Sequence, residues 1–314
     1  MLRLALTVLL SLPGAAIAQD YAPAYVPQAY ATQDGLPPDW LPPPVVAGDW
    51  AETLTLFGGI SGSKQPQDLG VNAHFGGRLA ANYGFALVDA ANLGAQIGVA
   101  GTYQDDAVRV FESVAVDTDR GQLFTTAGLF QKNELWNWSL VYDALYQDQW
   151  DRSTLTQFRG RVGVNMTARD EIGVWGTKND RGEEGVVAPL DLPVRLQAIS
   201  QLNLFWRHQY ESGAYTTIWG GVSEGHEEMT LVATDDRHLS TAPVFGADFR
   251  APLNDYCSLY GEANFVLPAD TGSVDSFLGI DIHPAGVAKC YRKLKYAPIL
   301  RPAGSPSFVV DARR

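Results

Sequence analysis

The sequence has no long apolar run after its first residues. It also has few charged residues, and fewer of them are basic than acidic. After residue 18 no stretch approaches the roughly 20 apolar residues that a membrane-spanning helix requires. The net charge is −12, which argues against nucleic-acid binding because such binding needs a basic footprint. Charged residues make up only 18% of the chain, whereas it has 31 glycines, eight tryptophans and 13 tyrosines. This composition is more typical of a transmembrane β-barrel than of a soluble domain.

Residues 1–18 have the pattern of a signal peptide. Arg3 supplies a positive charge, residues 4–12 are apolar, and Ala16-Ile17-Ala18 gives a small-x-small cleavage pattern. An anchor helix is the alternative, but the apolar run is too short to span about 30 Å of hydrocarbon. No cysteine follows it, so a lipid-modified N-terminus is not indicated. Cleavage after Ala18 is therefore expected.

The two ends of the mature chain differ in composition from the middle. Residues 19–49 are rich in proline, alanine and tyrosine and show neither a helical nor a strand period, which predicts an extended tail. This tail is either a spacer or a docking site for a peptide-binding module. Residues 284–314 form a basic tail with seven lysines and arginines and one acid, Asp311. Both tails are expected in the periplasm, where they could associate, or the basic one could contact anionic envelope polymers.

Between the tails, apolar and polar residues alternate with a period of two, which predicts β-strands. In 136–147, for example, tryptophan, leucine and tyrosine alternate with polar residues, with Val141 and Leu145 as exceptions. Most of these segments are longer than strands of soluble proteins and match the roughly 9–11 tilted residues that cross a bilayer. The expected strands are 53–61, 71–84, 93–105, 121–131, 135–147, 157–168, 171–178, 195–208, 213–222, 241–251, 256–267 and 275–282.

The connections between these strands alternate between short and long. Across the long ones and some flanking residues there are 19 acidic and seven basic residues, so an acidic rim is expected; the ranges counted are 62–70, 105–120, 147–156, 178–194, 223–240 and 268–275. Short periplasmic turns and long external loops are typical of outer-membrane barrels, and an even strand count leaves both termini periplasmic. Strands can cross hydrocarbon only as a closed sheet, because every backbone polar group needs a partner. The sequence thus predicts an all-β fold: a single antiparallel up-and-down transmembrane β-barrel of about 12 strands over residues 50–283, in the bacterial outer membrane.

A resemblance to a known group of proteins supports this prediction. It is carried by residues 121–143, by the turn His283-Pro284-Ala285-Gly286 and by the segments 296–300 and 307–311. These resemble an uncharacterised, porin-like family of predicted bacterial outer-membrane β-barrels, defined only as a domain of unknown function. The resemblance covers most of residues 50–314 and implies fold and location, but no catalytic or ligand-binding residues. Unlike typical barrels of this kind, the chain does not end in a strand with a terminal aromatic residue.

The alternation assigns six cations and three anions to the lumen. One interpretation is a pore lining that sets selectivity; the other is a set of cross-strand pairs that plug the barrel. Asp143 and Arg161 would form such a pair across a hairpin. The predicted lumen residues are Arg78, Asp143, Arg159, Arg161, Arg195, Arg207, Asp248, Arg250 and Glu262.

No catalytic residue, cofactor or metal site is predicted, and the chain is not expected to be an enzyme. A lipase would need a serine beside a histidine base, but His74, His208, His226 and His238 lack the spacing of known barrel lipases. The two cysteines, Cys257 and Cys290, fall near the expected periplasmic end, where a disulfide is plausible and two free thiols are the alternative. Three functions remain: a narrow porin-like channel for small solutes, a closed structural barrel that displays its loops, and a lipid-modifying enzyme. The expected partners are membrane lipid and small solutes.

Overall fold

The computed structural model describes residues 50–70, 73–107, 119–149, 151–187, 192–227 and 239–313. The expected signal peptide and the proline-rich tail lie outside the described residues. A four-residue helix, α2 (Trp50–Thr53), precedes the first strand. Within the described ranges, the structure contains no helix with the length and apolar character that a membrane crossing requires.

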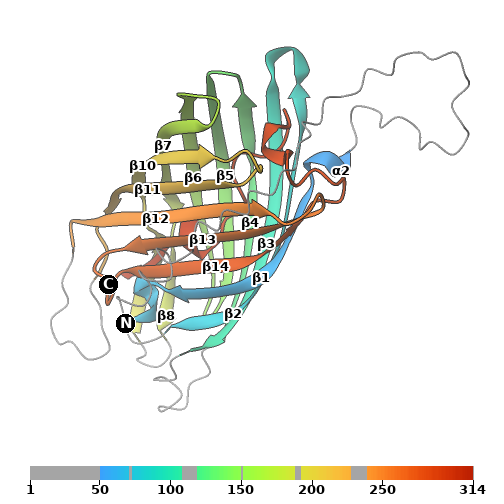
Figure 1. Ribbon diagram of the computed structural model, residues 1–314. Helices are drawn as coiled ribbons and strands as arrows, with labels where there is room; N and C mark the ends of the chain where they lie inside the picture. Colours follow the sequence, from blue (N-terminus) through green and yellow to red (C-terminus); the bar gives the residue numbers. More distant parts are fainter. Residues whose placement is uncertain are drawn as a thin grey trace, which may run out of the picture. The chain divides into compact units, whose positions relative to one another are not determined.

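Twelve antiparallel strands form a closed barrel, which confirms the predicted fold (Figure 1). Each barrel strand pairs with the next barrel strand along the chain, and the last pairs with the first over the range from Leu56↔Ile282 to Lys64↔Val274. Every long strand therefore has a hydrogen-bonding neighbour on both sides. The strands are β1 (Thr55–Lys64), β2 (His74–Val88), β3 (Leu93–Asp106), β4 (Arg120–Lys132), β5 (Trp136–Asp148), β6 (Arg152–Asn165), β7 (Asp170–Arg181), β10 (Gln201–Gln209), β11 (Tyr215–Glu224), β12 (Thr241–Pro252), β13 (Cys257–Val266) and β14 (Ser273–Ile282).

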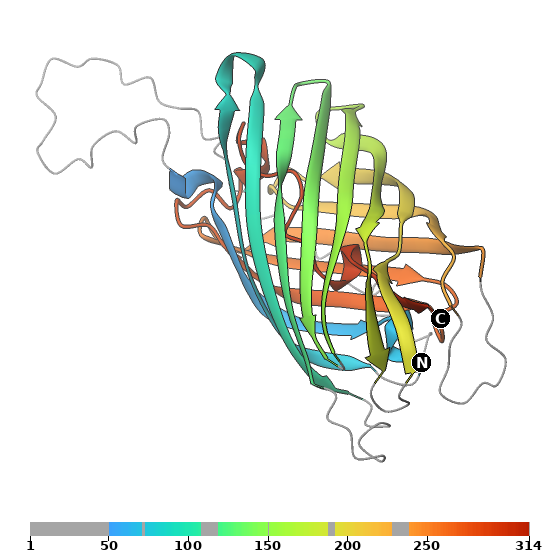
Figure 2. The same cartoon turned by 180° about the vertical axis from the view of Figure 1, so that it is seen from behind.

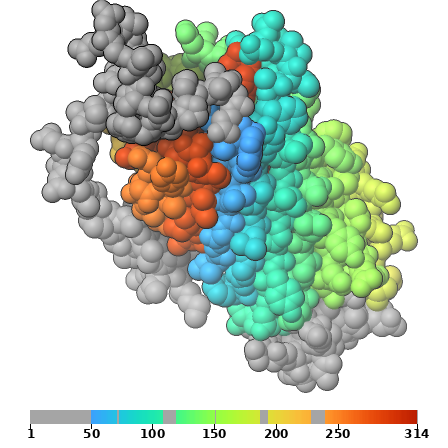
Figure 3. All heavy atoms as spheres, turned by 90° about the vertical axis from the view of Figure 1, so that its right-hand side faces the viewer, coloured from blue at the N-terminus to red at the C-terminus, as the bar shows by residue number. Residues whose placement is uncertain are grey.

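Apolar side chains cover the outside of the barrel and polar ones face inward. In β5, Leu140 is 52% exposed and Tyr146 is 43% exposed, whereas Ser139, Asp143 and Gln147 are at most 2% exposed. Figure 3 shows part of this outer face, where the side chains of neighbouring strands meet in a continuous wall. A soluble protein would bury the apolar set. The reverse arrangement is that of a barrel whose outside contacts lipid.

Short connections gather at one end of the barrel and longer ones at the other. Residues 133–135 and 253–256 are examples at the first end, which we call the short-turn end. The connections from β1 to β2 and from β11 to β12 are examples at the second, which we call the long-loop end. The predicted long loop 148–156 is wrong: residues 152–156 extend β6, and the pairing of β5 with β6 continues to Asp148↔Arg152, so only three residues separate the two strands.

One predicted barrel strand, 195–208, is two strands in the structure. Its second half is β10, but its first half belongs to β9 (Leu192–Ala198), which leaves the barrel wall. With β8 (Glu183–Val187) and β15 (Val310–Arg313), β9 forms a separate three-stranded sheet at the long-loop end. Val194 and Leu196 of β9 are each only 5% exposed. The period of two was right for both strands, but it carries no information on which sheet a strand joins.

Candidate functional site

The chain continues past the last barrel strand into the interior of the barrel. We call residues 283–313 the C-terminal arm; its red ribbon lies inside the ring of strands in Figure 2. It begins at the short-turn end with a single turn, η5 (Tyr291–Lys293). There the Lys132 ammonium at the end of β4 donates to the carbonyls of Arg292 (3.3 Å) and Leu294 (3.1 Å). The hydroxyl of Tyr291 donates to the carbonyl of Thr53 (3.2 Å), which ties the arm to the start of β1.

In the middle of the lumen, side chains of the wall bind the backbone of the arm. Arg78 of β2 donates to the carbonyls of Pro302 (3.3 Å) and Ala303 (2.9 Å). Asn82 and Gln96 both donate to the carbonyl of Leu300, at 3.0 and 2.9 Å. An extended segment without secondary structure leaves its carbonyls unsatisfied unless the surroundings supply donors. The polar inward face of the barrel supplies them.

Inward glycines of the wall make room for this segment. A Cβ on Gly98 of β3 would lie 2.7 Å from Cγ of Pro302. A Cβ on Gly84 of β2 would lie 2.8 Å from Cδ of Pro298 and closer still to the Tyr296 carbonyl oxygen. Larger side chains at these two positions would therefore collide with the arm.

The arm ends at the long-loop end as strand β15. Before it, the amide of Gln65, between β1 and β2, donates to the Phe308 carbonyl (3.2 Å) and accepts from the Val310 N–H (3.1 Å). β15 then pairs with β9, from Val310↔Ala198 to Arg313↔Arg195. The guanidinium of Arg313 donates to the carbonyl of Gly225 in the β11–β12 connection (2.7 Å). The arm thus crosses the lumen from one end to the other.

This path corrects two expectations. The basic tail was expected in the periplasm, but part of it lies in the lumen, where wall side chains donate to the carbonyls of Leu300, Pro302 and Ala303. The two ends of the described chain also do not share a side: α2 and the start of the arm lie at the short-turn end, whereas Arg313 lies at the long-loop end. The number of barrel strands is even, as predicted, which brings the end of β14 back to the short-turn end. The C-terminal arm then runs through the lumen to the opposite end. The expected association of the two tails involves residues 19–49 and lies outside the described residues.

An apolar cluster joins the arm to the wall in the half of the lumen near the long-loop end. Phe308 of the arm is fully buried, and its ring lies 6.0 Å from that of Phe124 in β4, at 61°. Leu145, an exception to the alternation in β5, points inward and belongs to this cluster. Burying a phenylalanine side chain stabilises a fold by roughly 1.5–3 kcal/mol. The cluster consists of Leu69, Ala100, Phe124, Leu145, Leu155, Val194, Leu196, Ala198, Ala303, Phe308, Val310 and Ala312.

Arg301 is the main charged anchor of the arm. Its guanidinium donates two hydrogen bonds to the carboxylate of Asp281 in β14, at 2.7 and 2.8 Å. It also lies 3.8 Å from the ring centroid of Tyr260 and 5.4 Å from that of Phe57. A planar guanidinium suits such a site because it can bind a carboxylate with both nitrogens while it stacks on aromatic rings.

The predicted lumen residues lie inside the barrel, with one exception. Arg78, Asp143, Arg159, Arg161, Arg207 and Arg250 are all less than a tenth exposed. Arg195 is exposed on β9, because that strand left the wall. Asp248 and Glu262 both line the small cavity that remains beside the arm.

These charges form pairs, but not always the expected one. Asp143 binds Arg159 (2.9 Å) rather than Arg161, because its register partner on β6 is Gln157. Arg161 instead pairs with Glu171 of β7, also at 2.9 Å. Arg207 lies 3.8 Å from Asp248 and Arg250 lies 3.9 Å from Asp281, so six of the nine predicted lumen residues have an ionic partner within 4 Å among the described residues.

Sequence reasoning missed the acids that organise the lumen. Glu171 lies within 3.6 Å of Arg207 and also pairs with Arg161 and with Arg292 of the arm. Asp281 holds Arg301. Both acids stand on the inward side of their strands, so the alternation itself could have identified them. Nothing in the sequence indicates that each of them also has a partner in the C-terminal arm.

A second buried charge cluster lies at the long-loop end. Asp68, in the short turn η1 (Pro66–Asp68), contacts Arg120 and His74, each at 3.1 Å. Burial opposes ionisation of this carboxyl group, but the charges of Arg120 and His74 outweigh it and lower the pKa of Asp68 to about 2. The other ring nitrogen of His74 lies 3.2 Å from Asp106. This histidine therefore sits between two carboxylates as part of the packed interior.

A cavity of about 80 Å³ lies beside the arm, lined by both wall charges and arm residues such as Arg301 and Ser307. That is room for a few water molecules, each of which occupies roughly 30 Å³ in the liquid.

Cys257 and Cys290 are not bonded to each other in the structure. Both lie at the short-turn end, as expected. The Ala288 N–H donates to the Asp255 carbonyl (2.7 Å), and each of these residues is two positions from one of the cysteines. The disulfide remains a prediction.

Three comparisons place the chain among known proteins. No curated protein matches the sequence. Solved structures with a similar barrel include the KdgM porin, with 9% identity, a TM-score of 0.39, and coverage of 72% of this chain and 98% of that one. The outer membrane phospholipase A from Escherichia coli has 8% identity and a TM-score of 0.39, over 73% and 95% of the two chains. The translocator domain of autotransporter NalP from Neisseria meningitidis has 11% identity and a TM-score of 0.45, over 73% and 86%.

Likeness this distant transfers no activity to the chain, and these proteins include an enzyme as well as a porin. The twelve-stranded closed barrel with its apolar outer face is nevertheless that of an outer-membrane protein. At the level of sequence, residues 53–310 match a family of unknown function. The chain belongs to this family, DUF6666.

Proposed function

We propose that this protein is a sealed β-barrel of the bacterial outer membrane, which presents its acidic loops outward and does not conduct solutes while its arm is in place. The observation that carries this proposal is the path of the arm. Side chains of the wall and of the β1–β2 connection bind its backbone from Leu300 to Val310, so the arm occupies a length of the lumen rather than one narrow point.

The apolar cluster supports a permanent rather than a transient plug. Phe124, Leu145 and Leu155 belong to the wall, point inward and are completely buried. Removal of the arm would expose part of these side chains to water, at about 25 cal/mol for each Å² of apolar surface. A wall built to line an open aqueous channel would carry polar residues at these positions.

A solute channel is the second candidate, and one observation favours it. The cavity beside the arm is lined by Arg159, Arg161, Arg207, Asp248 and Glu262. Charged lumen residues tune which ions pass through outer-membrane barrels. If the arm left the lumen, these groups would line a polar path.

Planar-bilayer recording of the refolded full-length mature protein distinguishes the two. The sealed barrel predicts no single-channel steps, because the arm fills the lumen. A form that ends after Lys295 lacks the luminal part of the arm and serves as the positive control, since its lumen should conduct. Stable steps from the full-length protein would contradict the sealed barrel and establish the channel.

A further inference from the structure

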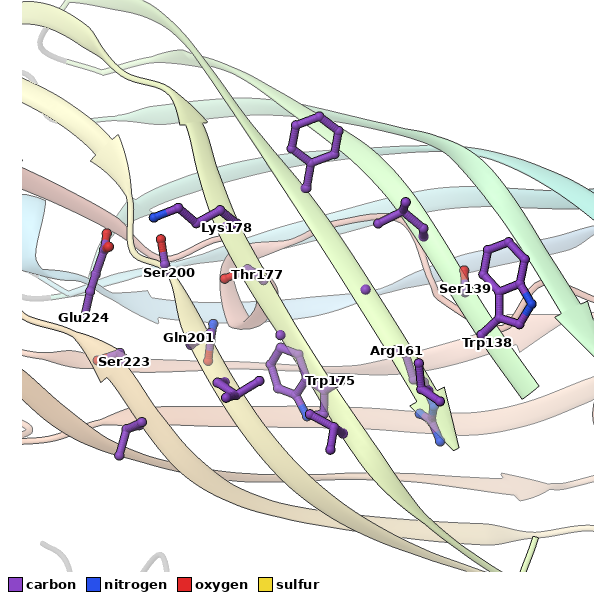
Figure 4. Close-up of a pocket in the computed structure, with 18 of the residues that line it drawn as sticks. Trp138, Ser139, Arg161, Trp175, Thr177, Lys178, Ser200, Gln201, Ser223 and Glu224 are labelled. Atoms are coloured by element: carbon purple, nitrogen blue, oxygen red, sulfur yellow. The ribbon is translucent and has the colours of Figure 1, made fainter. Parts of the chain in front are cut away.

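A hollow of about 820 Å³ lies at the barrel wall over β5, β6, β7, β10 and β11 (Figure 4). Its lining includes residues of both faces of the wall, but their exposure shows to which side it opens. Leu140, Val162 and Leu202 point outward and are 52–60% exposed, whereas Arg161 and Gln201 point inward and are at most 6% exposed. The hollow therefore opens on the lipid side and not into the lumen. Its volume falls within the range of ligand pockets, roughly 300–1,000 Å³.

Two glycines at outward positions deepen this hollow. Gly160 follows Phe158 on the outward side of β6, and Gly176 follows Val174 on that of β7. Neither has a side chain, whereas the side chains of Leu202 and the other outward neighbours project from the wall around them. A Cβ built on Gly160 would be 3.8 Å from Cδ1 of Leu140, so a larger residue would fit there and fill the space.

Lys178 stands at the edge of the hollow, near the end of β7 that leads to the long loops. It is the next outward position after Gly176, and Figure 4 shows it at the same end as Ser200 and Glu224. In the part of the chain that the structure describes, its ammonium makes no ion pair or hydrogen bond. Two acids are near Lys178, and both have other partners. Asp180, two positions along the chain, accepts from the Tyr142 hydroxyl (2.7 Å), and Glu224, which also lines the hollow, lies 3.7 Å from Arg313.

A cation on the lipid face of a barrel is unfavourable unless it reaches the interface or meets an anion. The lipid surroundings themselves offer one anion at this depth, the phosphate of a headgroup, which attracts lysine side chains. The apolar hollow beside Lys178 suits the hydrocarbon of the same molecule. One lipid would thus satisfy the charge and fill the volume together.

We propose that this hollow is a binding site for a phosphate-bearing membrane lipid, with its acyl chain against Leu140, Val162 and Leu202 and its phosphate on Lys178. The proposal requires the barrel to lie in a membrane, but it does not depend on whether the lumen conducts. No covalent step is involved. The site is a specific lipid contact on one side of the barrel.

The test measures lipid retention by the full-length mature protein in detergent, by native mass spectrometry. The probes are dioleoyl-phosphatidylglycerol and dioleoylglycerol, which share their acyl chains but differ in the phosphate. Wild-type protein should retain the phosphatidylglycerol more strongly. Lys178→Gln should lower its retention by about fivefold, the effect of one lysine near a lipid headgroup, and leave dioleoylglycerol unchanged.

Gly160→Val fills the hollow and should lower retention of both probes. Its matched control is Gly77→Val on the outward face of β2, where a Cβ would meet nothing within 4 Å and which lies outside the hollow; this variant should retain both probes like the wild type. Heat-modifiable gel mobility shows that each variant is folded. Unchanged phosphatidylglycerol retention in Lys178→Gln overturns the proposal, as does equal retention in Gly160→Val and Gly77→Val.

Discussion

Arg301 of the arm and Asp281 of β14 face each other inside the barrel, joined by two hydrogen bonds of 2.7 and 2.8 Å. Asp281 is fully buried, and Arg250 of β12, two strands away, lies 3.9 Å from the same carboxylate. The pair links the last segment of the chain to the strand that closes the ring with β1. The arm is therefore anchored to the strand that closes the barrel.

Replacement of Arg301 by alanine should destabilise the protein by about 3–5 kcal/mol, because it leaves a buried carboxylate without its main partner. The free energy of unfolding in urea would measure this loss. Arg169→Ala is the control. Arg169 pairs with Glu211 on the surface, where both side chains are more than half exposed, so its replacement should cost at most about 1 kcal/mol. Equal losses of unfolding free energy in the two variants would show that the buried Arg301–Asp281 pair stabilises the protein no more than a surface pair does. Asp281→Asn in the Arg301→Ala background should recover part of the loss.

Substitution of Gly98 by valine should destabilise the barrel by roughly 1–3 kcal/mol, the usual cost of overpacking a filled interior. The reason is the Pro302 ring, 2.7 Å from a Cβ at this position. Gly101→Val on the same strand is the matched control, since its nearest neighbour is the Gln122 carbonyl oxygen at 4.0 Å. Thermal or urea unfolding compares the two. If Gly98→Val is no less stable than Gly101→Val, the arm does not pack against β3.

The unfolding free energy should rise as the pH falls from 6 towards 4, in part through Asp311. Burial raises the pKa of Asp311 from its usual value near 3.8 to about 6, although Arg313 offsets some of this effect. In that window the folded state binds a proton that the unfolded state does not, so acid favours the folded state, by about 3 kcal/mol at most. Asp311→Asn cannot titrate and should show a flatter profile between pH 4 and 6. Parallel profiles for wild type and Asp311→Asn would refute this assignment.

Cys257 and Cys290 should form a disulfide when the protein is exported into an oxidising compartment. The hydrogen bond between the backbones of Ala288 and Asp255 and the ion pair between Lys289 and Asp255 (3.0 Å) hold the two segments together. Mapping of tryptic peptides without reduction should recover the two cysteines in one linked peptide. Reduction should then cost about 2–4 kcal/mol of stability, and a Cys290→Ser variant should not respond to reductant. Two free thiols in the exported protein would end this prediction.

An epitope tag fused after the last residue should be accessible to antibody on intact cells. The arm ends at the long-loop end, where Arg313 binds Gly225, and long loops face outward in outer-membrane barrels. A tag placed in the 253–256 turn should be reached only after the membrane is permeabilised. Detection of the C-terminal tag only in permeabilised cells would place the arm's end, or the whole barrel, the other way round.

The barrel wall was predictable in detail because its signal is local. In β5 the alternation of Leu140 and Tyr146 with Ser139 and Gln147 specifies which face meets lipid, and the structure follows it. The inward position of most predicted lumen charges follows from the same period. Arg195 was misplaced because β9 has the period of a wall strand while it pairs with β8 and β15 in another sheet.

The occupied lumen could not be predicted, since it depends on contacts between residues far apart in the chain. Residues 284–314 have no strand period over most of their length and an excess of basic residues, which resembles a free tail. The donors that hold them, such as Arg78 and Gln96, lie some 200 positions earlier in the sequence. No sequence pattern in the wall strands or in the C-terminal arm indicates that the two are in contact.

The sequence by itself determined the number of barrel strands and the direction of their side chains, because a period of two acts between neighbours in the chain. Only the tertiary structure decided that the barrel is filled by its own C-terminal arm. The polar inward face can form hydrogen bonds with any extended segment, and the sequence pattern does not indicate which segment will occupy the lumen. Closure of the ring brings the end of β14 to the mouth of the lumen, and the arm that follows it is the segment placed to occupy that space.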